Sequence, residues 1–304
     1  MPPTPMTTHP SPSQSELNKM LRGLARTGDL ENLRVALVQG ADPGDMRGLS
    51  LRAAAEEGHT ECLAALIQAL GPNPSALICE IALLSAAEAG RAECVKLLAG
   101  LCDPKDNSSL ALRVCAQNGH LECVKLLIPL SDALAQQSQA LHTAAENGHE
   151  DCVEALISVS DPLARNSGAL RTAAKEGHAA VVRILIPVSD PLAANSQAFL
   201  WAAAYGHEEC VRLLAPHCCT LENGAGAFLR CVSAGHASIA AFMLDHEPKM
   251  FSLLADPLAC AAEAALAGHQ QMAGVLSSWI ERLALGSEIA SPDIASQAAC
   301  RPRL

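Results

Sequence analysis

Apolar residues recur along this chain at helical spacing, in short segments that resemble one another. Each segment predicts a first helix in which a large apolar residue precedes two small ones, as Leu141 precedes Ala144 and Ala145. A glycine follows, and then a second helix whose Cys-Val or Val-Val pair and Leu-Leu-like pair share one buried face. We call these helix A and helix B, and each pair a repeat.

The glycine between the two helices gives the period of the pattern. Residues 138–166 and 167–195 agree at 18 of 29 positions. Successive marker glycines are mostly 29 residues apart, with gaps of 30, 32 and 33 toward the two ends; they are Gly28, Gly58, Gly90, Gly119, Gly148, Gly177, Gly206, Gly235 and Gly268. Self-similarity at a fixed short period is typical of stacked repeats. We therefore predict an all-α helical-repeat solenoid of about nine helix pairs over residues 16–283.

The two ends of the chain lack this pattern. Residues 1–15 hold five prolines among serines and threonines, a composition that predicts a disordered leader. An alternative interpretation is a recognition leader for a bacterial secretion machine, which would make the protein an effector delivered into a host cell. Residues 284–304 contain Gly, Ser and Pro, and we expect a weakly ordered tail there.

Polar residues at fixed places predict how each repeat is capped. Helix A opens near a serine whose hydroxyl is expected to accept from the free N–H groups of the first turn; these serines are Ser109, Ser138, Ser167 and Ser196. The marker glycine ends helix A because the residue there must tolerate positive φ. The next residue is usually histidine, as at His149, and we expect it to hydrogen-bond backbone across the glycine.

Together these features resemble the ankyrin repeat. The segment LHTAAENGH at residues 141–149 matches the family's Leu-His-x-Ala-Ala-x-x-Gly-His core, and residues 24–43 are similar to an ankyrin N-terminal repeat. Ankyrin repeats run about 33 residues, whereas these mostly run 29. Because the missing part lies between helix B and the next helix A, the resemblance implies β-hairpin fingers that are reduced or absent. It also implies that the inner, concave face of the A helices is the better binding surface.

The formal net charge of −11 narrows the classes of partner. Phosphate binding needs clustered Lys and Arg, so nucleic acid is disfavoured, as is an anionic membrane surface. No apolar run reaches the roughly 18 residues that a membrane span requires, and the N-terminus lacks the layout of a secretory signal. We expect a cytoplasmic monomer.

The 13 cysteines favour core packing over chemistry. Five lie four residues after a marker glycine, where other repeats have Val181 or Ile239; they are Cys62, Cys94, Cys123, Cys152 and Cys210. Free Cys behaves as a small hydrophobe, and equivalent residues of helices stacked about 8 to 10 Å apart do not reach disulfide or zinc distance. His217, Cys218 and Cys219 stay open as an alternative thiol or metal site. We expect no enzyme activity, metal or cofactor.

Large side chains on helix A indicate a protein-binding site. Trp201 and Tyr205 are four residues apart and share one helix face. Aromatic anchors dominate binding energy at protein interfaces; an alternative role is to cover a gap left by Ala203 and Ala204. Arg171, Lys175 and His142 border the pair, and toward the N-terminus the row turns acidic at Glu56, Glu57, Glu88 and Glu146. Two alternatives account for these acidic residues: they form a solvated face, or they bind a basic partner. We therefore expect a scaffold that binds a partner protein, of unknown identity, through its concave face.

Overall fold

The computed structural model describes residues 12–218, 221–246 and 257–289. These ranges contain 18 α-helices, two short 3-10 helices and no β-strand, which confirms the predicted all-α class and the absence of β-hairpin fingers there. The chain divides into two compact units, Met1–Asp161 and Pro162–Leu304, and each is described by itself. In both units the odd-numbered helices are A helices and the even-numbered helices are B helices.

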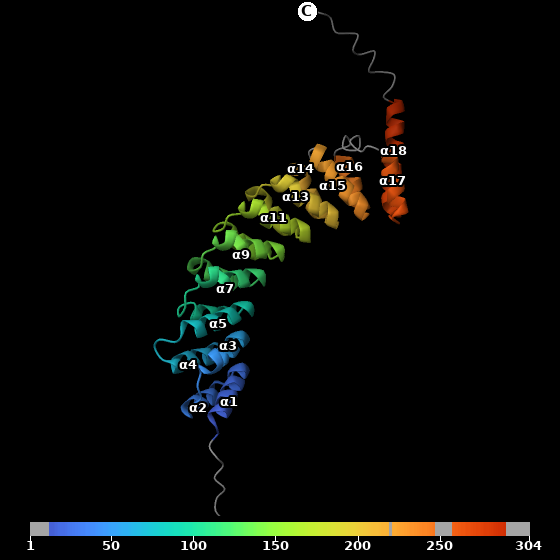
Figure 1. Cartoon of the computed structure of the whole chain (residues 1–304). Helices are drawn as coiled ribbons and strands as arrows, with labels where there is room; N and C mark the ends of the chain where they lie inside the picture. Colours follow the sequence, from blue (N-terminus) through green and yellow to red (C-terminus); the bar gives the residue numbers. More distant parts are fainter. Residues whose placement is uncertain (1–11, 219–220, 247–256, 290–304) are drawn as a thin grey trace, which may run out of the picture. The chain divides into compact units, whose positions relative to one another are not determined.

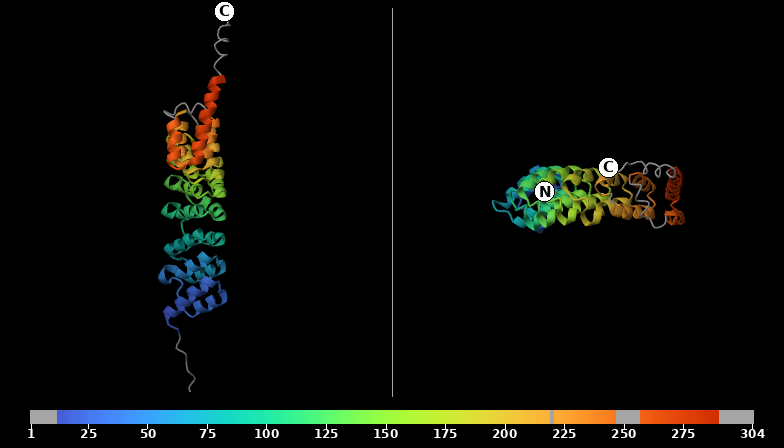
Figure 2. Two further views of the ribbon diagram at one scale, coloured as in Figure 1. Left: turned by 90° about the vertical axis from the view of Figure 1, so that its right-hand side faces the viewer. Right: turned by 90° about the horizontal axis from the view of Figure 1, so that it is seen from above.

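Unit 1 contains five described helix pairs (Figure 1). They are α1 (Gln14–Thr27) with α2 (Leu30–Val38), α3 (Asp45–Glu57) with α4 (Thr60–Leu70), α5 (Ala76–Glu88) with α6 (Ala92–Leu98), α7 (Asp106–Gln117) with α8 (Leu121–Leu127), and α9 (Ala135–Glu146) with α10 (Glu150–Ile157). The 3-10 helix η1 (Ile128–Leu130) follows α8. Within unit 1 each A helix packs on the next, as does each B helix, so that the pairs lie one above another (Figure 2).

Unit 2 contains the remaining four described pairs. They are α11 (Ala164–Glu176) with α12 (Ala179–Leu185), α13 (Ala193–Tyr205) with α14 (Glu208–Cys218), α15 (Leu221–Ala234) with α16 (Ala237–His246), and α17 (Pro257–Leu266) with α18 (Gln270–Ile289). The 3-10 helix η2 (Ile186–Val188) follows α12. The A helix α13 packs between α11 and α15, and the B helix α14 packs between α12 and α16, so unit 2 repeats the layering of unit 1.

The core of both units is made of small and medium apolar side chains. In α9, Leu141, Ala144 and Ala145 are all fully buried, and the corresponding residues of α3, α5, α7, α11 and α13 are buried in the same way. The five repeat cysteines are each about 1% exposed and carry free thiols, which confirms their predicted place in the core. Small residues at these places let neighbouring helices approach closely.

The turn from helix A to helix B joins each repeat to the one before it. The marker glycine Gly119 has φ of 75°, and a Cβ atom added there would lie 2.5 Å from Nδ1 of His149 in the following repeat. His149 Nε2 donates to the carbonyl oxygen of Gln117, at 2.9 Å. The histidine does hydrogen-bond backbone, as predicted, but the carbonyl belongs to the preceding repeat and not to its own turn. His59, His120, His207 and His236 make the same bond, and Arg91 makes it through Nε.

A left-handed turn stands where a longer repeat would have a finger. The second to fourth residues of α3, α7, α9, α11 and α13 all have positive φ, as at Gln136, Gln137 and Ser138 with φ of 49°, 59° and 56°. Each such residue costs about 1–2 kcal/mol when it is not glycine. Three residues therefore reverse the chain direction without a hairpin, at the expense of local strain.

The serines of this turn are not helix N-caps, and that prediction was wrong. Ser138 is buried, and its Oγ accepts from the backbone N–H of Asp161, at 2.8 Å. Ser109 accepts from Asp132 and Ser167 accepts from Asp190 in the same way. The hydroxyls of these three serines therefore hold the following turn.

The ends of the array differ slightly from the predicted boundaries. Helix α1 begins at Gln14, two residues before the expected start, because Ser13 and Glu16 form a reciprocal capping box. Helix α18 continues to Ile289, past the expected start of the tail at residue 284. Residues 1–11 and 290–304 lie outside the described residues. None of the described helices, α18 included, has the length and apolar content needed to cross a membrane.

Candidate protein-binding surface

The A helices form grooves where neighbouring helices meet, and four positions of the repeat line them. One A helix contributes the residues six and two before its marker glycine. The next A helix contributes the residues five and one before its own marker glycine. We call these four positions the inner face. In unit 1 a cavity of about 260 Å³ lies between α1 and α3 and another of about 300 Å³ between α5 and α7. In unit 2 a cavity of about 360 Å³ lies between α15 and α17.

Between α11 and α13, paired cations and aromatic rings occupy the inner-face positions. Arg171 and Lys175 of α11 stand six and two residues before Gly177, and Trp201 and Tyr205 of α13 stand five and one before Gly206. The Arg171 guanidinium carbon lies 5.7 Å from the centre of the Trp201 ring, and Lys175 Nζ lies 5.8 Å from the centre of the Tyr205 ring. The structure thus brings together the four predicted site residues of unit 2.

Hydrogen bonds from the surrounding backbone and side chains hold these groups. Arg171 Nη2 donates to the carbonyl oxygen of Arg165 in the left-handed turn, at 2.9 Å, and Nη1 donates to Oε1 of Gln197. The Tyr205 ring stacks on His207 with ring centres 6.5 Å apart, and His207 Nε2 donates to the Lys175 carbonyl oxygen at 2.7 Å. Arg171 therefore has a structural role in addition to any role in binding.

The exposure of the two rings differs. Trp201 is half-buried, whereas Tyr205 leaves 55% of its surface exposed. Beside them Lys175 Nζ pairs with Glu176 at 2.7 Å. The hydrogen bond from Lys175 lowers the pKa of the Glu176 carboxyl below its usual value. The surface presents an exposed ring bordered by charges.

The other two predicted site residues belong to unit 1. His142 and Glu146 stand six and two residues before Gly148 on α9, the places that Arg171 and Lys175 occupy on α11. His142 is half-buried and Glu146 is exposed. They are therefore the unit 1 equivalents of Arg171 and Lys175 on the inner face.

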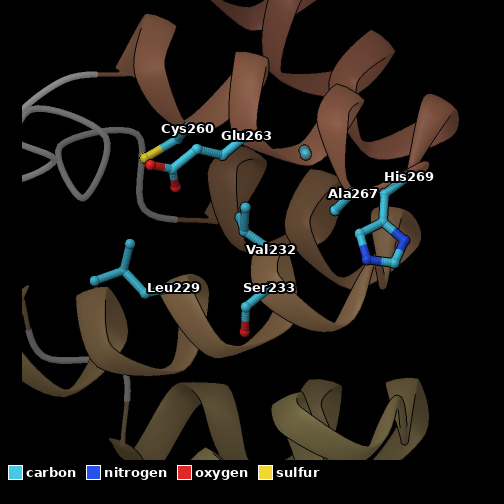
Figure 3. A pocket seen from close by; sticks show the side chains of 8 residues that line it. Leu229, Val232, Ser233, Cys260, Glu263, Ala267 and His269 are labelled. Atoms are coloured by element: carbon cyan, nitrogen blue, oxygen red, sulfur yellow. The ribbon is translucent and has the colours of Figure 1, made fainter.

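Two grooves on the inner face were missed by the sequence analysis. The acidic row expected near the N-terminus also contains Arg22, Arg26 and Arg52, and Arg26 Nε pairs with Glu57 at 3.3 Å. In unit 2, Leu229, Val232 and Ser233 of α15 face Cys260 and Glu263 of α17 and Ala267 just after it, with His269 at one end (Figure 3). Arg22, Arg26 and Leu229 stand six or two residues before a marker glycine. The repeat spacing would therefore have placed them on the inner face from the sequence alone.

Several of the described thiols are held in the neutral form by burial. Burial raises the pKa of Cys152 and Cys210 to about 11 and that of Cys231 to about 12, so these residues are neutral thiols at physiological pH. A hydrogen bond from the Cys115 thiol lowers the pKa of Cys123 below its usual value, but Cys123 is only 1% exposed. A buried thiol of this kind is closed to substrates.

The alternative site at His217, Cys218 and Cys219 is only partly described. His217 is exposed at the end of α14, whereas Cys218 is buried and its Sγ donates to the Pro191 carbonyl oxygen at 3.2 Å. Cys219 lies outside the described residues. Over the described ranges, no three His, Cys, Asp or Glu side chains gather in a way that suits a metal ion.

Comparison with known families agrees with the repeat geometry. A family model described as Ankyrin repeats (3 copies) matches the chain in five overlapping stretches, residues 50–138, 83–166, 114–198, 141–220 and 170–253. These stretches together span residues 50–253, more than half of the 304-residue chain. No curated protein matches the chain in sequence. The chain therefore belongs to the ankyrin-repeat family, whose repeats are protein–protein interaction modules.

Proposed function

We propose that the protein is a non-enzymatic scaffold that binds a partner protein through the inner face of α11 and α13. Trp201 and Tyr205 are the anchors of this surface. The observation that carries the proposal is that Tyr205 stays 55% exposed while cations of the neighbouring helix hold both rings in place. A ring that is both accessible and oriented suits recognition better than packing.

Orientation before binding lowers the cost of association. Immobilising a side chain at an interface costs about 0.5–1.5 kcal/mol, and a cation over an aromatic face contributes about 0.5–1 kcal/mol at an exposed site. The contacts of Arg171 with Trp201 and of Lys175 with Tyr205 therefore offset part of that cost before a partner arrives. Tyr and Trp are also the residue types most enriched among interface anchors.

The alternative role, covering a gap in the helix packing, applies to the two rings unequally. Ala203 is fully buried and Trp201 is half-buried, so the Trp201 ring does cover part of α13. Tyr205 covers little, because more than half of its surface faces solvent. A gap-filling role predicts a loss of stability on truncation, whereas a binding role predicts a loss of partner with little change in stability.

Affinity capture followed by mass spectrometry tests the proposal. The wild type is compared with Trp201→Ala/Tyr205→Ala, and Leu77→Ala serves as the control because Leu77 is similarly exposed, at 53%, on α5 of unit 1. We expect the double variant to lose proteins that the wild type and the control retain, with a melting temperature lower by only a few degrees. Equal capture by all three proteins would sink the assignment of this surface.

The charged residues near the rings have secondary roles in this proposal. Lys175 borders the exposed ring, so Lys175→Ala is expected to weaken capture less than loss of Tyr205 does. His142 and Glu146 occupy the corresponding inner-face positions of α9 in unit 1. We include them as peripheral contacts, and a capture pattern unchanged by His142→Ala/Glu146→Ala would remove them from the surface.

We further infer a monomer in a reducing compartment such as the cytosol. The described cysteines all carry free thiols, and most are buried. Disulfides are rare in the cytosol, where thiols stay reduced. Light scattering during size exclusion checks the monomer, and fluorescence microscopy of the tagged full chain checks the compartment.

A further inference from the structure

Exposed apolar side chains recur at the turns of unit 1 that lead from helix B to the next helix A. The turns after α6, α8 and α10 each contain an exposed aspartate, which is Asp103, Asp132 or Asp161. Two residues before it stand Leu101, Leu130 and Val159, with 36%, 43% and 37% of their surfaces exposed, and two residues after Asp132 stands Leu134, at 58%. We call Leu101, Leu130, Leu134 and Val159 the turn stripe.

The backbone of the turn forces these side chains outward. Leu134 N donates to Oδ1 of Asp132 at 3.0 Å, which fixes the chain just after the aspartate. The residue between them, Ala133, is buried, as is Pro104 at the same place in the preceding turn. Since the residue after Asp103 and the residue after Asp132 face the core, the next residue in each of these two turns faces solvent. Exposure of Leu134 is therefore built into the turn.

Hydrogen bonds between successive turns keep the stripe continuous within unit 1. Ser160 Oγ donates to the Ala133 carbonyl oxygen at 3.5 Å, so Val159 and Leu134 flank the same bond. One turn earlier, Ser131 Oγ donates to the Pro104 carbonyl oxygen at 3.5 Å, next to Leu130. Contiguous exposed apolar patches on soluble proteins commonly mark interaction sites.

Charge on the same edge indicates the chemistry of the partner. Asp103, Asp106, Asp132 and Asp161 are exposed along these turns, against one exposed cation, Lys105. Leu163 and Arg165 follow Asp161 in the same turn, within unit 2, and the next turn of unit 2 has Asp190 and exposed Leu192 without a cation. The turns of Asp103 and Asp132 together hold three exposed aspartates against that one cation, so the apolar edge of unit 1 carries an excess of carboxylates.

We propose that the turn stripe of unit 1 binds a basic amphipathic helix of a partner protein. Stacked helices are about 8–10 Å apart, and a helix advances roughly 10.5 Å in seven residues. A helix laid along the stripe places apolar residues at i and i+7 against successive turns. Lys or Arg beside those residues then faces the aspartates, and like charge disfavours an acidic helix. This surface is separate from the rings of α13 and does not depend on them.

The probe is a synthetic helix of Leu and Lys, roughly 18 residues long so that it spans about 27 Å, with leucines at i, i+3, i+4 and i+7. Fluorescence anisotropy measures its binding to the full-length protein. We expect at least tenfold weaker binding by Leu130→Gln/Leu134→Gln, and several-fold weaker, less salt-sensitive binding by Asp103→Asn/Asp132→Asn, since Asn keeps the turn hydrogen bond. Val35→Gln, which changes a 51% exposed side chain on α2, is expected to bind like the wild type. Circular dichroism melting verifies that each variant is folded.

Several outcomes would overturn the proposal. They are absence of binding to the wild type, equal binding of a Leu/Glu or a scrambled Leu/Lys peptide, or unchanged binding by folded Leu130→Gln/Leu134→Gln. Concentration-dependent dimerisation of the wild type that this variant abolishes would instead assign the stripe to a second copy of the chain. Trp201→Ala/Tyr205→Ala is expected to bind the peptide normally, so failure of either proposal leaves the other intact.

Discussion

The turn after helix A and the inner face of the same helix are governed by different constraints. At the turn every marker glycine has positive φ, between 70° and 86° where the structure gives it, and the next residue is usually a histidine that contacts the preceding repeat. On the inner face one position holds Arg22, Leu84, Arg113, Arg171 and Leu229 in different repeats. Backbone geometry determines which residues the turn accepts. The inner face is exposed to solvent, so its residue types vary from repeat to repeat. Partner specificity is therefore to be sought on the inner face.

The largest effect that separates the two regions is expected from Gly119→Ala. The substitution places a non-glycine residue at φ of 75° and puts its Cβ 2.5 Å from the ring of His149. The left-handed strain and the displaced histidine together predict a loss of about 2–4 kcal/mol in the free energy of unfolding. Urea unfolding followed by circular dichroism measures it.

A matched control for this variant is Gly23→Ala. Gly23 lies inside α1, and a Cβ added there has nothing within 4 Å. Alanine in a helix interior is more favourable than glycine by about 0.5–1 kcal/mol, so this variant should be slightly stabilised. Similar behaviour of the two variants would show that the marker glycine has no special role.

A smaller loss is expected from Ser138→Ala. The backbone N–H of Asp161 loses its acceptor, and leaving a partly buried donor unsatisfied costs about 1–3 kcal/mol. The exposed Ser158 offers a control, because Ser158→Ala is expected to change the free energy of unfolding by no more than about 0.5 kcal/mol. The urea midpoints of the two variants test this, and equal midpoints would contradict the structural role of Ser138.

His149→Ala is expected to cost about 1 kcal/mol, the typical contribution of one hydrogen bond. His149→Arg should recover most of the loss, because Arg91 at the corresponding place donates through Nε to the Glu56 carbonyl oxygen at 3.0 Å. Thermal unfolding of both variants tests this. If arginine proves no better than alanine, the bond to the preceding repeat is not what stabilises the turn.

The smallest effect is expected on the inner face itself. Tyr205→Ala removes a ring that is 55% exposed and that contacts Lys175 and His207. Exposed substitutions of this kind change stability by about 0.5 kcal/mol or less. A loss comparable to that of Gly119→Ala would place Tyr205 with the structural residues, and differential scanning calorimetry distinguishes the two results.

The helices and their pairing were predictable from the sequence, while the links between repeats were not. The marker glycines and the Leu-Ala-Ala pattern of α9 reflect local geometry, which can be predicted from a few neighbouring residues. The acceptor of His149 lies 32 residues earlier and the donor to Ser138 lies 23 residues later. A helix N-cap was the best local explanation for Ser138, and the tertiary bond to Asp161 replaced it.

The left-handed turns show the same limit for backbone conformation. Arg165 and Ala194 adopt φ of 55° and 51°, which their residue types disfavour. Only the packing of neighbouring repeats keeps these residues there. For the candidate site, the sequence identified Trp201 and Tyr205 and their shared helix face. It did not indicate that Arg171 and Lys175 would lie over the two rings, since that depends on the distance between α11 and α13.

The bonds of His149 and of Asp161 both reach back toward the N-terminus, to Gln117 and to Ser138. During synthesis, the Gln117 carbonyl and the Ser138 hydroxyl leave the ribosome before His149 and the backbone N–H of Asp161, which donate to them. Each newly made helix pair can therefore seal the one already outside the exit tunnel, and the array can be completed in the order of its synthesis.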